Sequence, residues 1–284
     1  MNTAQKIAKE STISFIGIFY GSINRYLYSA LLARWVGPEY LGIYSMANAI
    51  MLIGEVLSKM GMETGTMRFI SRLDPKKDQK EISRIIASAM KMCFVVSLIV
   101  ATALIASSSF IVYNILSEKT LMINVLIVFA IALPFNAMTL IGASATQGYK
   151  KLKYKAFVTQ LVNPTILLFS MIICFSLFSA ESALMYPILI TGILGFYVML
   201  RPIKSLSSMR ALDILKGKKN YELLKYSYPF MFVIILQTFM HWMDILMLGY
   251  FTNAETVGLY HPAARTAGLL QSLLMSFISI YAPM

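Results

Sequence analysis

The chain has 284 residues, of which 58% are hydrophobic and 13% charged, and its net charge is +12. Soluble domains are about 45–50% apolar and about 25% charged, so this composition excludes an ordinary soluble domain and predicts a polytopic membrane protein. In a soluble protein so much positive charge would favour a nucleic-acid partner. No such partner is expected here, because the basic residues are placed as topology signals.

Eight apolar runs follow one another with short polar separators, and each is long enough for the roughly 20 residues that cross roughly 30 Å of hydrocarbon. They cover residues 13–35, 41–60, 92–114, 120–147, 156–178, 182–200, 226–250 and 257–282. The runs are continuously apolar and do not alternate as barrel strands do. The predicted fold class is therefore all-α, with eight transmembrane helices. Cys93 and Cys174 lie inside two of these runs, which predicts buried thiols rather than a disulfide or a metal site.

Lys and Arg are concentrated in alternate connections between the runs. Two precede the first run, eight lie in 59–91, four in 150–155 and seven in 201–225. The opposite connections hold only Arg34 and Lys119. By the positive-inside rule, this asymmetry predicts a multi-pass protein of the cell membrane with a cytoplasmic N-terminus.

Two short segments share the frame E-x-x-G-[LI]-Y-x-x-A at an offset of 216 positions, namely EYLGIYSMANA (39–49) and ETVGLYHPAAR (255–265). Six runs separate them, and an even number returns the chain to the same side. The copies therefore share one orientation, as in parallel transporter repeats. The sequence predicts a six-helix N-terminal lobe over 1–200, a cytoplasmic linker over 201–225 and the first two helices of a second lobe over 226–284. If each repeat unit has about 216 residues, two complete units need roughly 430 residues. The chain is therefore expected to be a truncated form, about two-thirds of such a protein.

Two longer stretches around these frames carry a family resemblance: LLARWVGPEYLGIYSMANAI (31–50) and DILMLGYFTNAETVGLYHPAARTAGLL (244–270). They resemble the polysaccharide biosynthesis (Wzx-type) flippases of the multidrug/oligosaccharidyl-lipid/polysaccharide exporter superfamily. The resemblance implies a MATE-like fold of two six-helix lobes around a central cavity. It also implies flipping of a polyprenyl-pyrophosphate-linked oligosaccharide from the cytoplasmic to the outer leaflet by alternating access. Expected partners are the lipid-linked saccharide, membrane lipids and polysaccharide-assembly proteins.

Two arginines lie inside apolar runs, where a charge costs roughly 2.5–3.5 kcal/mol. Arg25 shares a helix face with small and polar residues, and Arg265 follows His261 by four positions. A guanidinium grips a phosphate through two parallel hydrogen bonds, so both arginines are predicted to bind the substrate pyrophosphate. The resemblance supports this, because the lipid II flippases place arginines of their first and eighth helices in the cavity. His261 and Asn48 complete the predicted substrate-binding set.

The seventh run carries Gln237, His241 and Asp244 on one helical stripe. We expect Asp244 and His241 to form a station for a coupling proton or sodium ion, because burial and nearby arginines would tune a carboxylate there. The alternative is that Asp244 merely pairs with Arg265. No metal site is predicted, since two histidines lack a further defined ligand set.

Other polar residues in the runs have local interpretations. Glu55 lies four residues before Lys59, which predicts an intrahelical ion pair rather than a substrate contact. For the two arginines, a salt bridge to Glu55 or Asp244 is the alternative to phosphate binding. Pro134 and Pro164 predict kinks, because proline removes a helix hydrogen bond.

No Gly-rich phosphate loop, zinc signature or nucleophile motif occurs, so no enzymatic activity, catalytic residue or cofactor is expected. Three alternatives to the flippase remain. A cation-coupled multidrug exporter of the same superfamily would have an acidic, aromatic cavity, and the two arginines argue against it. A membrane enzyme such as a polymerase or ligase would need a large outer loop. A non-transporting scaffold is the third.

Overall fold

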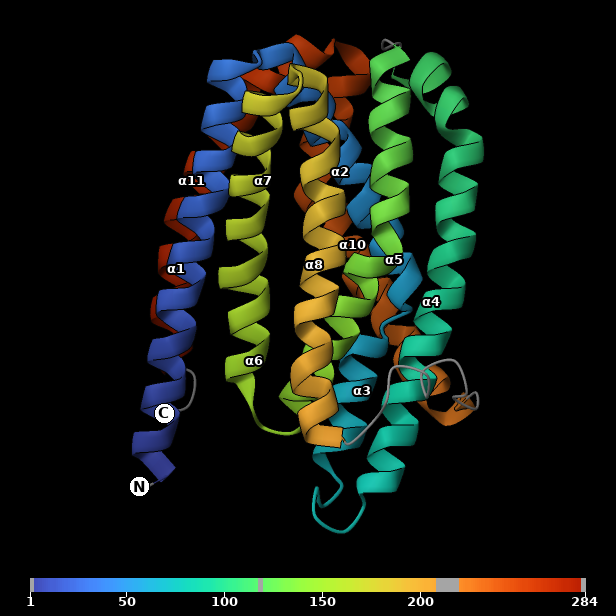
Figure 1. The fold of residues 1–284 in the computed structure, drawn as a ribbon, viewed down its shortest axis with the longest axis vertical. Coiled ribbons are helices and arrows are strands. Elements are labelled where there is room, and N and C mark those ends of the chain that lie inside the picture. The colour runs from blue at the N-terminus through green and yellow to red at the C-terminus, as the bar shows by residue number, and fades with distance from the viewer. Residues whose placement is uncertain (1–2, 117–119, 208–219, 282–284) are drawn as a thin grey trace.

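The computed structural model describes residues 3–116, 120–207 and 220–281, and every regular element within these ranges is a helix (Figure 1). The elements are α1 (Thr3–Trp35), α2 (Pro38–Lys59), α3 (Met62–Ser71), α4 (Gln79–Phe110), η1 (Ile111–Ile115), α5 (Thr120–Gly148), α6 (Leu152–Ala156), η2 (Phe157–Val162), α7 (Asn163–Leu177), α8 (Ala180–Ser207), α10 (Tyr221–Phe251) and α11 (Ala254–Tyr281). The long helices run side by side along the longest axis of the molecule (Figure 1). The predicted all-α class is confirmed.

Six helical stretches of the described chain are long and apolar enough to cross a membrane. They are Pro38–Lys59, Gln79–Asn114, Thr120–Gly148, Leu152–Leu177, Ala180–Ser207 and Tyr221–Phe251. These six correspond to the second to seventh predicted runs and confirm a multi-pass membrane protein. The first run lies within α1, and the eighth lies within α11 except for residue 282, which is outside the described residues; neither helix is among the six. The count of eight spans therefore stays a prediction.

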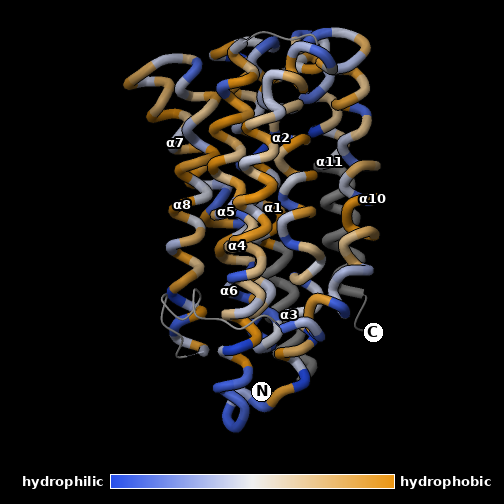
Figure 2. The backbone as a smooth tube through the Cα atoms, turned by 90° about the vertical axis from the view of Figure 1, so that its right-hand side faces the viewer, coloured by the Kyte–Doolittle hydropathy of each residue, from blue (hydrophilic) through white to orange (hydrophobic). Residues whose placement is uncertain are grey.

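The two ends of the helix bundle differ in polarity. The N-terminal end of α1, helix α3 and helix α6 lie at the same end (Figure 1), and Figure 2 shows hydrophilic residues gathered there. This end carries the connections at 72–78 and 149–151, which belong to the predicted basic segments. We call it the basic end, and its assignment to the cytoplasm stays a prediction.

The two copies of the repeated frame contact each other at the opposite end. A Cβ atom on Gly42 of α2 would lie 1.7 Å from the backbone oxygen of Ala254, and a Cβ on Gly258 of α11 would lie 1.7 Å from the backbone oxygen of Pro38. Pro38 and Ala254 are themselves 216 positions apart. The contact is thus reciprocal between equivalent positions, as expected for two like-oriented units related by an axis along the membrane normal. Only residues without a side chain allow backbones to approach so closely.

A sharp break separates α2 from α3 at the basic end. Met60 and Gly61 both have left-handed backbone conformations, with φ angles of 47° and 70°. Gly61 is needed here for a second reason, since a Cβ at this position would lie 2.3 Å from the backbone oxygen of Ser227 in α10. Because of this break, α3 packs against α5, and α10 packs closely against the α2–α3 junction.

The fifth run is irregular where Pro164 was expected to bend it. Pro164 lies in the first turn of α7, directly after the π-helical segment η2. Proline cannot donate to the carbonyl four residues earlier, which is that of Gln160. This carbonyl faces α1, where a Cβ on Gly21 would lie 2.7 Å from it. Helix α5, in contrast, continues through Pro134.

Helices α10 and α11 pack mainly on α1, α2 and α3, whereas α5, α7 and α8 form the other side of the N-terminal lobe. Helix α8 runs to Ser207, seven residues past the predicted end of that lobe. Residues 208–219, nearly half of the predicted linker, lie outside the described residues, so the domain boundaries stay predictions. Cys93 and Cys174 are free and buried.

Candidate functional site

Arg25 projects from the middle of α1 toward the irregular segment η2. Its guanidinium donates a hydrogen bond to the side-chain oxygen of Gln160, with Nη2 and Oε1 3.0 Å apart. The glycine one turn earlier, Gly21, allows η2 to come this close. The partner of Arg25 is therefore a neutral amide, and its positive charge is not cancelled by this contact.

Arg265 lies on α11, also beside neutral groups. Its Nε donates to Nε2 of His261, 3.1 Å away, and its Cζ lies 5.3 Å from the centroid of the Trp242 ring. His261 is only 1% exposed. An imidazole whose Nε2 accepts a hydrogen bond is neutral, and Nδ1 of His261 is buried without a hydrogen-bond partner among the described residues. The stacked indole and the neutral imidazole position the guanidinium but leave its charge in place.

The two arginines are brought together around Tyr44 of α2. Each guanidinium interacts electrostatically with Tyr44, and the charge of Arg265 also disfavours that of Arg25. Tyr44 is buried, with its ring 5.1 Å from that of Tyr28. The consecutive helices α1 and α2 and the much later helix α11 thus create one region of positive charge inside the bundle.

Arg25 also lines a cavity of about 220 Å³ within the N-terminal lobe. The lining comes from α1, α2, α5, η2, α7 and α8, and much of it is polar: Arg25, Glu55, Asn136, Thr139, Thr159, Asn163 and Thr191. The side-chain oxygen of Asn163 is buried and makes no hydrogen bond with the described residues. The cavity therefore offers a charged wall and several hydrogen-bonding groups to a polar guest.

The other predicted site residues lie elsewhere. Asn48 is buried in α2, at 8% exposure, and does not line this cavity. Asp244 and His241 are exposed on α10. Asp244 accepts a hydrogen bond from the hydroxyl of Tyr260, 2.7 Å away, while the ring of His241 lies 5.6 Å from that of Trp242.

Neither arginine is paired with a carboxylate in the part of the chain that the structure describes. The two ion pairs formed there both involve Lys59, and Asp244 bonds to Tyr260 instead. The alternative in which Arg25 or Arg265 is held by Asp244 or Glu55 therefore does not describe this conformation.

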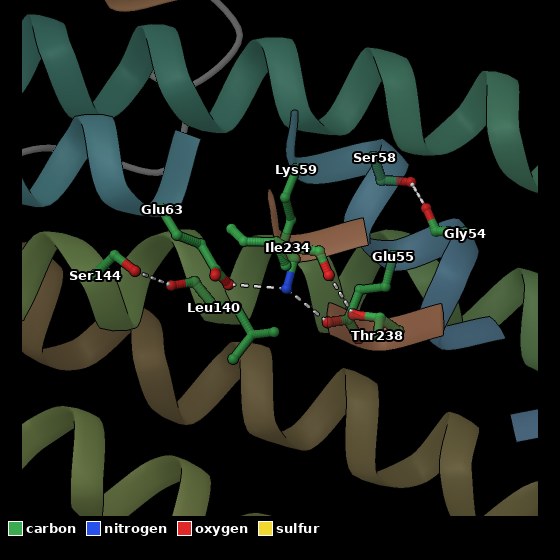
Figure 3. A network of polar contacts seen from close by, with 9 residues as sticks. All are labelled: Gly54, Glu55, Ser58, Lys59, Glu63, Leu140, Ser144, Ile234 and Thr238. Atoms are coloured by element: carbon green, nitrogen blue, oxygen red, sulfur yellow. Dashed lines mark hydrogen bonds and ion pairs between the residues drawn. The ribbon is translucent and has the colours of Figure 1, made fainter. Parts of the chain in front are cut away.

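Lys59 forms the centre of a buried polar cluster at the basic end (Figure 3). Its Nζ lies 2.9 Å from Oε1 of Glu55 and 2.9 Å from Oε1 of Glu63. The Glu55 pair was predicted from the four-residue spacing. Glu63 lies four residues after Lys59, so the same spacing occurs on the other side of the lysine. Sequence reasoning did not predict this second pair, and the structure shows a helix break between the two residues. Lys155 also interacts electrostatically with Glu63 and Lys59, so two cations face the two carboxylates of the cluster.

The chain matches the polysaccharide biosynthesis protein family over residues 7–284. It belongs to this family. The fold of this polysaccharide biosynthesis protein is similar to that of the MATE multidrug transporter DinF-BH, with a TM-score of 0.75, 14% identity, and coverage of 100% of this chain and 66% of the other. A second similar structure is a MOP superfamily transporter from Pyrococcus furiosus, with a TM-score of 0.61, 14% identity, and coverage of 99% and 70%. A search of curated proteins finds no match.

These similarities confirm the predicted family and the predicted MATE-like fold. The chain spans 66% of the length of the first similar structure. At 14% identity the likeness concerns the fold alone. The chemistry of the site must therefore be argued from this chain's own residues.

Proposed function

We propose that this chain forms part of a transporter that flips a polyprenyl-pyrophosphate-linked oligosaccharide from the cytoplasmic to the outer leaflet of the cell membrane. The family and the fold support transport across a membrane. One observation carries the choice of substrate: Arg25 and Arg265 both interact electrostatically with Tyr44, and each is held by a neutral partner.

Two such guanidiniums repel each other and lose hydration, so they are costly without an anion. A pyrophosphate offers oxygen pairs that match the fork of each guanidinium. Binding of the doubly anionic head would therefore relieve the repulsion between Arg25 and Arg265. His261 and Trp242 would hold Arg265 in position, since they contact it directly.

The sugar part of the head group would use neutral polar groups. Asn136, Thr139 and Thr191 line the cavity beside Arg25 and offer donors and acceptors that suit hydroxyl groups. Asn48 on the neighbouring α2 is proposed as a further contact when the lobes move. The polyprenyl tail would stay in the lipid, because it is apolar throughout.

Alternating access requires a contact that can open. We assign this role to the approach of Gly42 and Gly258 at the end opposite the basic end, because α2 and α11 belong to the two different repeat units. Their separation would expose the arginine pair to the outer leaflet. Asp244 and His241, both on the exposed face of α10, are proposed to couple this motion to a proton or sodium ion.

Complementation tests the substrate proposal. The full-length gene, with Arg25→Gln or Arg265→Gln, is expressed in a strain that lacks its native polysaccharide flippase. Both variants should abolish surface polysaccharide at normal membrane levels, whereas Arg34→Gln, which removes an exposed arginine from the end of α1, should not. Full export by both cavity variants would contradict the phosphate role.

A cation-coupled drug exporter is the second candidate, because a carboxylate, Glu55, also lines the cavity. Lys59 pairs with that carboxylate, which weakens its attraction for a cationic drug. Dye efflux by the full-length protein, lost in Glu55→Gln but kept in Arg25→Gln, would favour the exporter. An assay in proteoliposomes separates the flippase from an enzyme or scaffold of polysaccharide assembly. The purified flippase alone should move a fluorescent lipid-linked saccharide between leaflets, whereas an enzyme or a scaffold should not.

A further inference from the structure

A second, larger cavity lies on the outside of the N-terminal lobe at its basic end. It has a volume of about 550 Å³ and lies between the α6–η2 segment and the last turns of α8. This volume falls in the range of about 300–1,000 Å³ that is typical of ligand pockets. Its floor is apolar and consists of Phe157, Val158, Leu161, Val198 and Pro202. We call it the α6–α8 groove.

Both walls of the α6–α8 groove are irregular where they face each other. The residues Phe157, Val158 and Leu161 belong to the π-helical segment η2, and such segments are frequent at functional sites. On the other wall, Pro202 interrupts the hydrogen bonds of α8. Two adjacent helix irregularities prevent close packing of the helices, which explains why an open apolar groove exists at this place.

Two cations flank the groove. Lys153 and Arg201 are exposed and line its rim, and no ion pair is formed by either among the residues that the structure describes. Lys153 lies over the ring of Tyr154 at 5.0 Å, and Arg201 lies over that of Tyr197 at 5.4 Å. These aromatic contacts keep both side chains at the rim and leave their charges available.

We propose that the α6–α8 groove binds one anionic glycerophospholipid of the leaflet at the basic end. An acyl chain would lie along Phe157, Leu161 and Val198, and the phosphate would lie between Lys153 and Arg201. Charge complementarity selects an anionic lipid over a zwitterionic one, since basic residues at the membrane surface attract anionic headgroups. The rings of Phe157 and Tyr197 are 51% and 57% exposed, so the apolar part of the groove is accessible from outside the lobe.

The groove and the cavity beside Arg25 both use η2, but they have no lining residue in common. Helices α10 and α11 pack mainly on α1, α2 and α3, whereas the groove is built from α6, η2 and α8. Helix α6 and the end of α8 lie at the basic end of the bundle (Figure 1). The proposal therefore does not depend on the substrate of the transporter.

Native mass spectrometry of the purified full chain tests the proposal with phosphatidylglycerol and phosphatidylcholine as probes. The wild type should retain one phosphatidylglycerol in preference to phosphatidylcholine. The double variant Lys153→Ala/Arg201→Ala should lower the phosphatidylglycerol affinity about 25-fold, since each basic residue near an anionic lipid contributes about fivefold. The matched control Lys151→Ala/Lys204→Ala removes two exposed cations that do not line the groove and should change the affinity little.

A second variant tests the apolar floor without changing charge. Val198→Trp fills the groove and should abolish retention of the lipid, whereas Ile193→Trp at an exposed position of the same helix should not. Equal retention of both lipids by the wild type, or equal loss in the groove variant and its control, would overturn the proposal. So would displacement of the phospholipid by polyprenyl phosphate at equal concentration, because the groove would then belong to the substrate's tail.

Discussion

The reciprocal contact between the two repeat units allows a sharp prediction for Gly42→Ala. The added Cβ would lie 1.7 Å from the backbone oxygen of Ala254, half of the 3.4 Å at which ordinary contact begins, and 2.6 Å from its carbonyl carbon. Both atoms belong to the backbone, so no side-chain rotation can relieve the overlap. Helices α2 and α11 must separate. Overpacking costs about 1–3 kcal/mol, and we expect the upper value, about 3 kcal/mol.

Gly258→Ala should destabilise by the same amount, because its Cβ would meet the backbone oxygen of Pro38 at the same distance of 1.7 Å. The assay heats the detergent-solubilised protein and measures the fraction that stays monodisperse. The midpoint temperature of each variant should be about 6 °C lower, because a loss of 1 kcal/mol lowers it by about 2 °C. Gly268→Ala is the control in the same helix, since nothing lies within 4 Å of its added Cβ. If Gly42→Ala and Gly258→Ala unfold like Gly268→Ala, the close approach of α2 and α11 is wrong.

Three further predictions concern Lys59, Asp244 and Cys93. Lys59→Met leaves Glu55 and Glu63 without their cation and should lower the stability of the protein by about 3 kcal/mol in the same heating assay. Breaking a buried pair costs about 3–5 kcal/mol. The lower value is expected because the side chain of Glu63 is 25% exposed. Replacing both glutamates by Gln in that variant should restore most of the loss, and no recovery would show that the cost arises elsewhere. Asp244→Asn should make transport in proteoliposomes independent of an imposed proton or sodium gradient; an unchanged response would remove Asp244 from coupling. Cys93, which is fully buried, should resist a membrane-permeant maleimide until the protein unfolds, and rapid labelling of the native protein would contradict its burial.

The sequence alone determined the features that depend on local composition and spacing. Continuous apolar runs predicted the helices, because each span must be long enough for the hydrocarbon layer. The pairing of Glu55 with Lys59 followed from a spacing of four, which places both side chains on one helix face. The shared frame likewise identified Gly42 and Gly258 as equivalent. It contained no information that these two positions touch.

Only the tertiary structure decided which faces meet. Gln160 accepts a hydrogen bond from Arg25, which is 135 residues away in sequence. Asp244 contacts Tyr260 instead of an arginine. Glu63 forms an ion pair with Lys59 across a helix break. Periodicity tells which side of a helix is polar, but the rotation and height of one helix against another depend on packing between backbones and side chains that are distant in sequence. For this reason the sequence could name residues able to bind an anion, while their grouping around Tyr44 and the groove beside η2 arise from the assembled bundle.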